Sequence, residues 1–272
     1  MRPCLVVIAA LALLASVAGP GDLTAQQLDL SRFQLVDLTH PLNAGTYFWP
    51  TSPSGFELKQ LAKGPTPGGW FYSAYAFSAP EHGGTHLDAP IHFSATGLST
   101  DQIPLGRLVA PAVVLDVSAQ AARDHDYRLT VADVEAFERR HGRIAPGVMV
   151  LLRTGWDRFW SSRKDYFGDD TPGDASHLHF PSYGAEAARL LVEQRRVAAL
   201  GADVASIDYG ASTDFQVHRA AAARNVIELE NLRGLDRLPP VGAVLLALPM
   251  KIEGGSGGPL RAVALVPRTL GR

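Results

Sequence analysis

The sequence is almost without cysteine. Cys4 is the only one, and it lies close to the N-terminus, in a segment that we expect to be removed. The mature chain then has none, which excludes disulfide bonds, zinc–thiolate sites and a cysteine nucleophile. Any metal ion must therefore be bound by nitrogen and oxygen ligands.

The sequence also lacks blocks of like charge. The formal net charge is −2 and no long basic run occurs, so nothing indicates nucleic-acid binding. Beyond the N-terminus, no apolar run is long enough to cross a bilayer. With 272 residues, 46% of them hydrophobic, the chain has enough apolar material for one globular core.

The one long apolar run is at the N-terminus. Arg2 precedes an apolar stretch from Leu5 to Val17, and Ser16 to Ala18 offers a small-residue cleavage site, with Ala25 as an alternative. This pattern is typical of a secretory signal peptide, and the run is too short for a membrane span. Residues 1–25 are therefore interpreted as signal peptide and start of the mature tail; an uncleaved anchor is the alternative. We expect a periplasmic or secreted protein with no membrane contact after cleavage.

The remaining chain, residues 33–272, predicts an α/β domain. Strands are expected at 35–38, 70–77, 111–117, 148–153, 197–207, 243–251 and 261–266. Helical patterns lie at 184–196 and 213–224, and a third runs from a capping box at Thr130 to Gly142. Strands interleaved with helices favour an α/β class. Residues 155–182, rich in aromatic residues, are interpreted as a surface insertion whose aromatics pack at a subunit interface or wall a pocket.

Three histidines and an aspartate fall within a short segment that begins at His82 and ends at His92. His86 and Asp88 are two residues apart, so in an extended segment their side chains point the same way. Gly83 and Gly84 disfavour a helix, which predicts a glycine turn leading into a short strand. Structural histidines would be the ordinary interpretation of one such residue, but this cluster is a ligand set suited to zinc or manganese.

The cluster predicts hydrolytic chemistry. The ligands His82, His86 and Asp88 leave coordination positions open, as catalytic metal sites do. A metal there lowers the pKa of bound water, to about 7 for zinc, and polarises a carbonyl oxygen. Both effects serve hydrolysis of an amide or lactam, and His92 is the natural group to move protons.

A second motif, Gly254-Gly255-Ser256-Gly257-Gly258, formally matches the serine-hydrolase pattern G-x-S-x-G. That pattern requires a strand before the serine and a helix after it, whereas Pro259 and another apolar strand follow here. We interpret the motif as a glycine turn between strands.

The segment H-G-G-T-H-L-D-A-P-I-H-F, residues 82–93, resembles the signature of the cyclase family of metal-dependent hydrolases, which includes bacterial kynurenine formamidases and isatin hydrolases. The similarity extends to residues 35–50, 207–232 and 249–266. The resemblance implies a compact single domain with a twisted mixed β-sheet flanked by helices. It also implies a homodimer or homotetramer.

The resemblance further implies a role for each matching residue. His82, His86 and Asp88 would bind a first metal ion. Asp88 would also bridge to a second ion, which His218 and Glu230 would bind. His92 would donate and accept protons, and Trp49 would line the substrate pocket. One or two zinc or manganese ions per subunit fit this pattern. Without the resemblance, His218 and Glu230 would pass as ordinary surface residues.

The favoured hypothesis is a metal-dependent hydrolase that opens a small aromatic amide, either an aryl formamide or a cyclic amide. The export signal and the 155–182 segment both depart from the small formamidases, and the segment is closer in style to the isatin-hydrolase-like members. Two alternatives are a non-catalytic periplasmic binder that uses the same metal and a metal-dependent lyase or cyclase.

Overall fold

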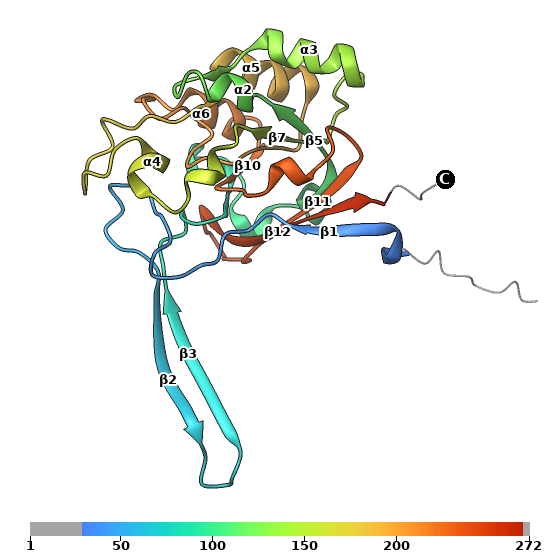
Figure 1. Cartoon of the computed structure of the whole chain (residues 1–272). Helices are drawn as coiled ribbons and strands as arrows, with labels where there is room; N and C mark the ends of the chain where they lie inside the picture. The colour runs from blue at the N-terminus through green and yellow to red at the C-terminus, as the bar shows by residue number, and fades with distance from the viewer. Residues whose placement is uncertain (1–28, 269–272) are drawn as a thin grey trace, which may run out of the picture. The chain divides into compact units, whose positions relative to one another are not determined.

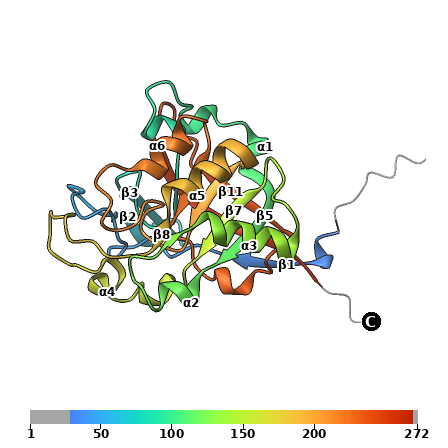
Figure 2. The same ribbon diagram turned by 90° about the horizontal axis from the view of Figure 1, so that it is seen from above.

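The computed structural model describes residues 29–268 (Figures 1 and 2). By its internal contacts the chain divides into residues 1–30 and 31–272, and the elements below belong to the second unit. The predicted signal peptide, residues 1–25, lies outside the described residues. Within residues 29–268, no helix is long and apolar enough to cross a membrane.

One mixed sheet organises the domain. Its strands are β1 (Phe33–Asp37), β4 (His86–Asp88), β5 (Val109–Asp116), β7 (Met149–Arg153), β9 (Ala199–Ala202), β10 (Ile227–Glu230), β11 (Ala243–Pro249) and β12 (Gly257–Pro267). Their order is β1-β12-β11-β5-β7-β9-β10-β4, and β4 also pairs with β12, so the sheet closes on itself. β5, β7, β9 and β10 run parallel, and the other pairings are antiparallel. The predicted mixed sheet is confirmed; its closure into a barrel-like form was not foreseen.

The central parallel strands are buried on both faces. In β7, Met149 and Leu151 belong to one hydrophobic cluster, while Val150 and Leu152 belong to the other. A strand covered on both sides has no polar face, which explains the unbroken apolar run in the sequence.

Helices pack on both sides of this sheet. They are α1 (Leu105–Leu108), α2 (Ser118–Ala121), α3 (Val131–His141), α4 (Arg163–Phe167), α5 (Ala185–Arg189) and α6 (Gln216–Ala222). Val134 of α3 and Ala187 of α5 belong to one hydrophobic cluster, and Leu108 of α1 belongs to the other. α3 and α5 lie over β5 and β7 (Figure 2). The predicted capping box is present, because the Asp133 amide donates to Thr130 Oγ1 at 3.2 Å and the Thr130 amide donates to Asp133 Oδ2 at 2.8 Å. α5 continues as a π-helical turn over Leu190–Arg195, which confirms the helix predicted at 184–196.

The strand predicted at 197–207 is too long. β9 ends at Ala202, because the side chain of Asp203 turns back and accepts hydrogen bonds from the amides of Thr154 and Gly155 at 2.8 and 2.7 Å. Residues 203–208 thereby become a loop at the carboxyl end of β9. This loop lies beside the candidate site described below.

The segment 155–182 does not behave as a surface insertion. The side chains of Trp156 and Tyr166 are fully buried and Phe167 is 2% exposed, all within the core of the single chain. Trp156 Nε1 donates to the Tyr166 carbonyl at 2.8 Å, which ties the two ends of this turn together. The interface interpretation is therefore wrong for these aromatics, because the chain's own core already covers them.

Exposed apolar side chains instead gather on a hairpin of β2 (Glu57–Pro65) and β3 (Phe71–Ser78). These strands pair with each other and with no other described strand, and Figure 1 shows the hairpin reaching away from the sheet. β3 confirms the predicted aromatic strand. β2 was missed because its residues are almost all exposed, so no burial pattern marks it. A second small pair joins β6 (Arg128–Leu129) to β8 (Ser182–Tyr183).

Candidate metal centre

The short strand β4 carries the first part of the site. His86 and Asp88 are two residues apart in extended backbone, as predicted, and both are 2% exposed. Gly84 has a φ of +58°, which makes the turn into the strand, and Pro90 opens the 3-10 turn that ends at His92. The glycine turn and the short strand expected from the sequence are both present.

The neighbouring strand β10 adds carboxylates. In the antiparallel register Glu228 lies opposite Asp88 and Glu230 lies opposite His86. Cross-strand partners on one face are close neighbours, so two acids face the histidine and aspartate of β4. α6 contributes His218, which is 4% exposed rather than on the helix surface.

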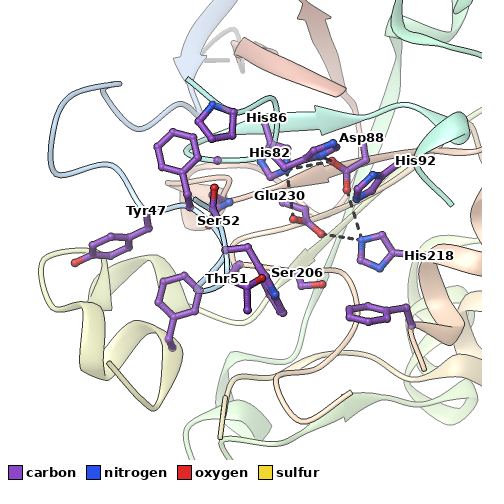
Figure 3. A pocket seen from close by; sticks show the side chains of 18 of the residues that line it. Tyr47, Thr51, Ser52, His82, His86, Asp88, His92, Ser206, His218 and Glu230 are labelled. Carbon is purple, nitrogen blue, oxygen red and sulfur yellow. Dashed lines mark hydrogen bonds and ion pairs between the residues drawn. The ribbon is translucent and has the colours of Figure 1, made fainter. Parts of the chain in front are cut away.

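The side chains of His82, His86 and His218 converge on Asp88 (Figure 3). Asp88 Oδ1 lies 2.6 Å from His82 Nδ1 and 3.1 Å from His86 Nε2, while Asp88 Oδ2 lies 3.5 Å from His218 Nε2. Glu230 Oε2 lies 3.5 Å from His86 Nε2, and Glu230 Oε1 lies 3.3 Å from His218 Nε2. The five residues expected to bind metal thus lie in one cluster around Asp88, although no group of mutually close ligand atoms among the described residues contains both His82 and His86.

Each imidazole has its outer nitrogen engaged elsewhere. His86 Nδ1 lies 3.0 Å from the Gly84 carbonyl, and His218 Nδ1 lies 2.6 Å from Asp208 Oδ2. His82 Nε2 lies 2.9 Å from Ser256 Oγ. The remaining nitrogen of each ring therefore faces the carboxylates, as it does in metal-binding histidines held by outer partners.

The donor set fits a divalent cation. His86 Nε2 is buried and has no hydrogen-bond partner within residues 29–268, although it faces two carboxylates. A buried polar atom without a partner is costly, and a bound cation would satisfy it. The described residues form three overlapping groups that could hold an ion, His82–Asp88–His92, His86–Asp88–Glu230 and Asp88–His218–Glu228, and all share Asp88.

The electrostatics also favour positive charge here. Burial alone would lower the pKa of His86, but the Asp88 carboxylate and its neighbours raise it to about 9. The same competition raises the pKa of His218 above its usual range, with Glu228 the first opposing carboxylate. The imidazoles of His86 and His82 hold the pKa of Asp88 well below its usual range, against the effect of burial. A site that stabilises protonated imidazoles by buried carboxylates will also stabilise a metal cation.

His92 differs from the other histidines. Its ring stacks on His82 with centroids 3.8 Å apart, and its side chain remains accessible. Desolvation, joined by the nearby histidines, lowers its pKa to about 4, so the ring is neutral at pH 7. A neutral imidazole beside the ligand cluster can accept a proton and return it.

A cavity of about 350 Å³ opens onto the cluster. Aromatic side chains form much of its wall: Tyr47, Phe48, Trp49, Phe93, Phe167 and Phe215. Trp49, predicted in the substrate pocket, lies here and meets Phe215 edge-on with ring centroids 6.5 Å apart. Phe167 brings the 155–182 segment into this wall, which agrees with its alternative interpretation as a pocket wall. The shape and lining suit a small planar substrate.

Comparison with known proteins identifies the family. The Cyclase family model ("Putative cyclase") matches residues 36–209, well over half of the chain. This chain belongs to the cyclase family. Isatin hydrolase of Roseibium aggregatum is 36% identical over 197 residues, which cover 69% of this chain and 73% of that protein. Kynurenine formamidase of Sphingopyxis alaskensis is 31% identical over 227 residues, covering 84% and 95%. An isatin hydrolase structure bound to the product analogue thioisatinate matches with a TM-score of 0.80 and 31% identity, over 88% of this chain and 94% of that chain.

Membership in the cyclase family confirms the resemblance drawn from residues 82–93. The relatives are hydrolases of amide C–N bonds, in agreement with the predicted reaction class. The family model ends at residue 209, before His218 and Glu230. The placement of those two residues at the site therefore depends on the geometry described above.

Two groups at this cyclase-family site were missed from the sequence. Glu228 is 3% exposed, its Oε1 has no partner among the described side chains, and burial raises its pKa well above the usual range. Asp208 holds His218 in place. The spacing of Glu228 and Glu230, two apart in a short apolar strand, is the one local signal that could have indicated two acids on a single face.

Proposed function

We propose that the chain is a metal-dependent hydrolase of a small aromatic cyclic amide such as isatin, with an aryl formamide such as N-formylkynurenine as the second candidate substrate. The observation that carries this is the convergence of His82, His86 and His218 on Asp88 at an aromatic cavity. Glu230 lies against His86 and His218 in the same cluster. The cyclic amide is favoured by the isatin hydrolase sequence that is 36% identical to this chain and by the isatin hydrolase structure that matches with a TM-score of 0.80.

In this proposal the metal-binding residues would divide into two subsites that share Asp88. His82 and His86 would hold a first zinc or manganese ion with Asp88. His218 and Glu230 would hold a second. A divalent cation supplies a water that is nucleophilic near neutral pH and polarises the substrate carbonyl.

Glu228 supports occupancy of the second subsite. Its carboxylate lies 3.9 Å from His218 Nε2 and adds an acid to the group that could hold an ion. Metal analysis of the purified protein is expected to give two ions per chain, and one ion after substitution Glu228→Gln. A stoichiometry of one in both proteins would contradict the second subsite.

His92 provides the proton transfer in this proposal. Its ring lines the cavity and is neutral at pH 7, so it can take a proton from the attacking water and deliver it to the leaving nitrogen. The aromatic walls, Trp49 among them, orient a flat substrate and exclude water from around it.

The direct test is a substrate panel on the mature protein. Isatin and N-formylkynurenine are incubated with protein that has been stripped of metal and reloaded with zinc or manganese. Uptake of water into a ring-opened or deformylated product is expected only with metal. Unchanged ligand bound to the loaded protein would instead indicate the binder, and a product formed without water uptake would indicate the lyase.

The place of action follows from residues 1–25. Their signal-peptide pattern supports export to the periplasm or the medium. Cell fractionation with N-terminal sequencing of the exported form tests this; a cytoplasmic protein that retains Met1 would contradict it.

A homodimer or homotetramer is part of the proposal, and the β2–β3 hairpin supports it. Leu61, Trp70 and Phe71 are 61, 63 and 65% exposed, and both outer edges of the hairpin lack a strand partner in the described chain. Large exposed apolar groups on a free edge favour association. A second copy of the chain is the partner that would cover them.

A further inference from the structure

Ser256 lies behind the metal site, in the glycine motif that turns from β11 into β12. Its Oγ lies 2.9 Å from His82 Nε2 and 2.6 Å from Glu81 Oε2. Its amide also donates to Glu81 Oε2, at 3.0 Å. A line of contacts therefore runs from Glu81 through Ser256 to His82, whose other nitrogen faces Asp88.

The donors and acceptors along this line have one consistent arrangement. A carboxylate only accepts, so the Ser256 hydroxyl donates to Glu81. The lone pairs of Ser256 Oγ then accept the proton on His82 Nε2. His82 Nδ1 is left as the nitrogen that faces Asp88 Oδ1 at 2.6 Å, a contact that needs positive charge on or between the two groups.

Glycine on either side of Ser256 permits these contacts. A Cβ at Gly257 would lie 2.6 Å from His82 Cε1, and a Cβ at Gly255 would lie 2.8 Å from Glu81 Oε1. Any larger residue would push the histidine or the glutamate away. The G-S-G sequence is thus explained by close approach to two side chains.

Hydrogen bonds from outside the loop fix its position. The Ala89 amide donates to the Ser256 carbonyl at 2.8 Å, and the Thr100 amide donates to the Gly255 carbonyl at 2.9 Å. Ala89 directly follows the ligand Asp88, so the loop is attached to the same segment that it supports. Ser256 is consequently held in register with the metal ligands.

The same contacts argue against a nucleophilic serine. Ser256 donates its proton to Glu81 rather than to His82, and it is not among the residues that line the cavity. No helix follows it, because β12 begins at Gly257. Ser256 therefore acts on His82 and not on the substrate.

We propose that Glu81 and Ser256 are positioning residues that fix the His82 ring and its tautomer, which leaves Nδ1 free as a metal ligand. This rests on the proposed function, because it takes His82 as a ligand of the first metal ion. Outer partners of this kind typically change metal affinity or activity roughly 10- to 100-fold when removed.

The test measures zinc and manganese affinity of the full chain by competition with a chromophoric chelator. Ser256→Ala and Glu81→Ala are each expected to weaken metal binding roughly 10- to 100-fold. The double variant should bind metal as tightly as the single variant with the larger loss, because both residues act through one contact with His82. Ser176→Ala is the matched control. Ser176 donates to Asp174 through its amide and hydroxyl at 2.8 and 2.6 Å but contacts no predicted ligand, so its affinity should equal the parent's.

The nitrogen spectrum of His82 gives a readout that a merely structural role would not move. In ¹⁵N-histidine-labelled, metal-loaded protein, His82 should carry its proton on Nε2, and Ser256→Ala should change that signal while the His86 signal stays. Parent-like affinity and an unchanged His82 signal in both single variants would overturn the proposal. His86→Ala distinguishes failure of the proposed metal site from failure of the positioning role. If His86→Ala also binds metal like the parent, the metal site itself is wrong. If His86→Ala loses metal while the Ser256 and Glu81 variants bind it normally, only the positioning role is wrong.

Discussion

At Asp88, one carboxylate faces three imidazoles from two parts of the chain. Two of these, His82 and His86, come from the same short segment and could be predicted from spacing alone. Their approach to Asp88 Oδ1 at 2.6 and 3.1 Å agrees with that prediction. Substitution of each residue around Asp88 can therefore be tested by measuring metal binding and turnover separately.

His92→Ala is expected to separate turnover from metal binding. Because the ring stacks on His82 without being one of the predicted ligands, the variant should keep its metal and lose roughly 10²- to 10⁴-fold in kcat. Metal analysis and steady-state kinetics on the same sample measure both quantities. His177→Ala, an exposed histidine outside the cavity, serves as the control. Near-parental kcat in His92→Ala would refute the assignment.

Asp203 predicts a pH dependence of stability. This carboxyl is 1% exposed, and burial raises its pKa from 3.8 to about 6, against the hydrogen bonds from Thr154. The folded state therefore binds more protons than the unfolded state between about pH 4 and pH 6, and stability falls as the pH rises through that window. A shift of this size corresponds to about 3 kcal/mol.

Asp203→Asn removes the titration. Unfolding in urea, with chelator present to remove metal effects, is measured from pH 4 to pH 7. The parent should lose about 3 kcal/mol relative to Asp203→Asn between pH 4 and 6, with no further change above that. A difference that stays constant across the range would contradict the raised pKa.

Among the elements, the β2–β3 hairpin carries the clearest prediction. Trp70→Ser with Phe71→Ser should reduce the mass in solution to that of a single chain, because these exposed side chains would lie at the contact between copies. Light scattering coupled to size exclusion gives the mass. Leu105→Ser, at a leucine that is 73% exposed in α1, is the control and should leave the mass unchanged. A parental mass for the hairpin variant would contradict the association surface.

The elements also show how far the sequence could predict the fold. The capping box at Thr130, the buried run of β7 and the β4 turn are local patterns, and each appears where expected. The end of β9 depends on hydrogen bonds that Asp203 accepts from the amides of Thr154 and Gly155, 49 and 48 residues earlier in the chain, and no local pattern reveals them. The burial of Trp156 was missed for a related reason, since aromatic composition cannot distinguish an interface from the chain's own core.

Two site residues could not be predicted from the sequence for the same reason, because long-range contacts place them. Glu228 reaches the site through the register of β10 on β4, and Ser256 reaches His82 across 174 positions of sequence. Pairing of this kind is set by the fold as a whole. His218 could be placed only by the resemblance to a known family, because nothing local marks it as buried. For Glu230 the one local signal is its spacing from Glu228, and the resemblance supplied its role.

At the scale of the whole molecule, closure of the sheet assembles the site. β4 lies between β10 and β12, so the histidine motif, the two glutamates and the glycine loop meet along one set of neighbouring strands. A metal ion bound there contacts segments that are distant in sequence. Its binding should therefore stabilise the entire domain.

Metal removal tests that coupling. An ion at about 100 times its dissociation constant adds about 2.7 kcal/mol, so stripping the protein should lower the thermal midpoint by roughly 5 to 10 °C. Calorimetry with and without chelator measures the shift. His86→Ala, which lacks a ligand of the first ion, should show a smaller shift than the parent. An identical midpoint for stripped and loaded parent protein would indicate that no ion binds in the folded state.

Anomalous X-ray diffraction from metal-loaded crystals, collected at the zinc or manganese absorption edge, tests the central claim most directly. We predict a peak within bonding distance, about 2.0 to 2.2 Å, of His82 Nδ1, His86 Nε2 and an oxygen of Asp88. Loaded crystals with no peak beside Asp88, or with these three side chains bonded to no common ion, would contradict it.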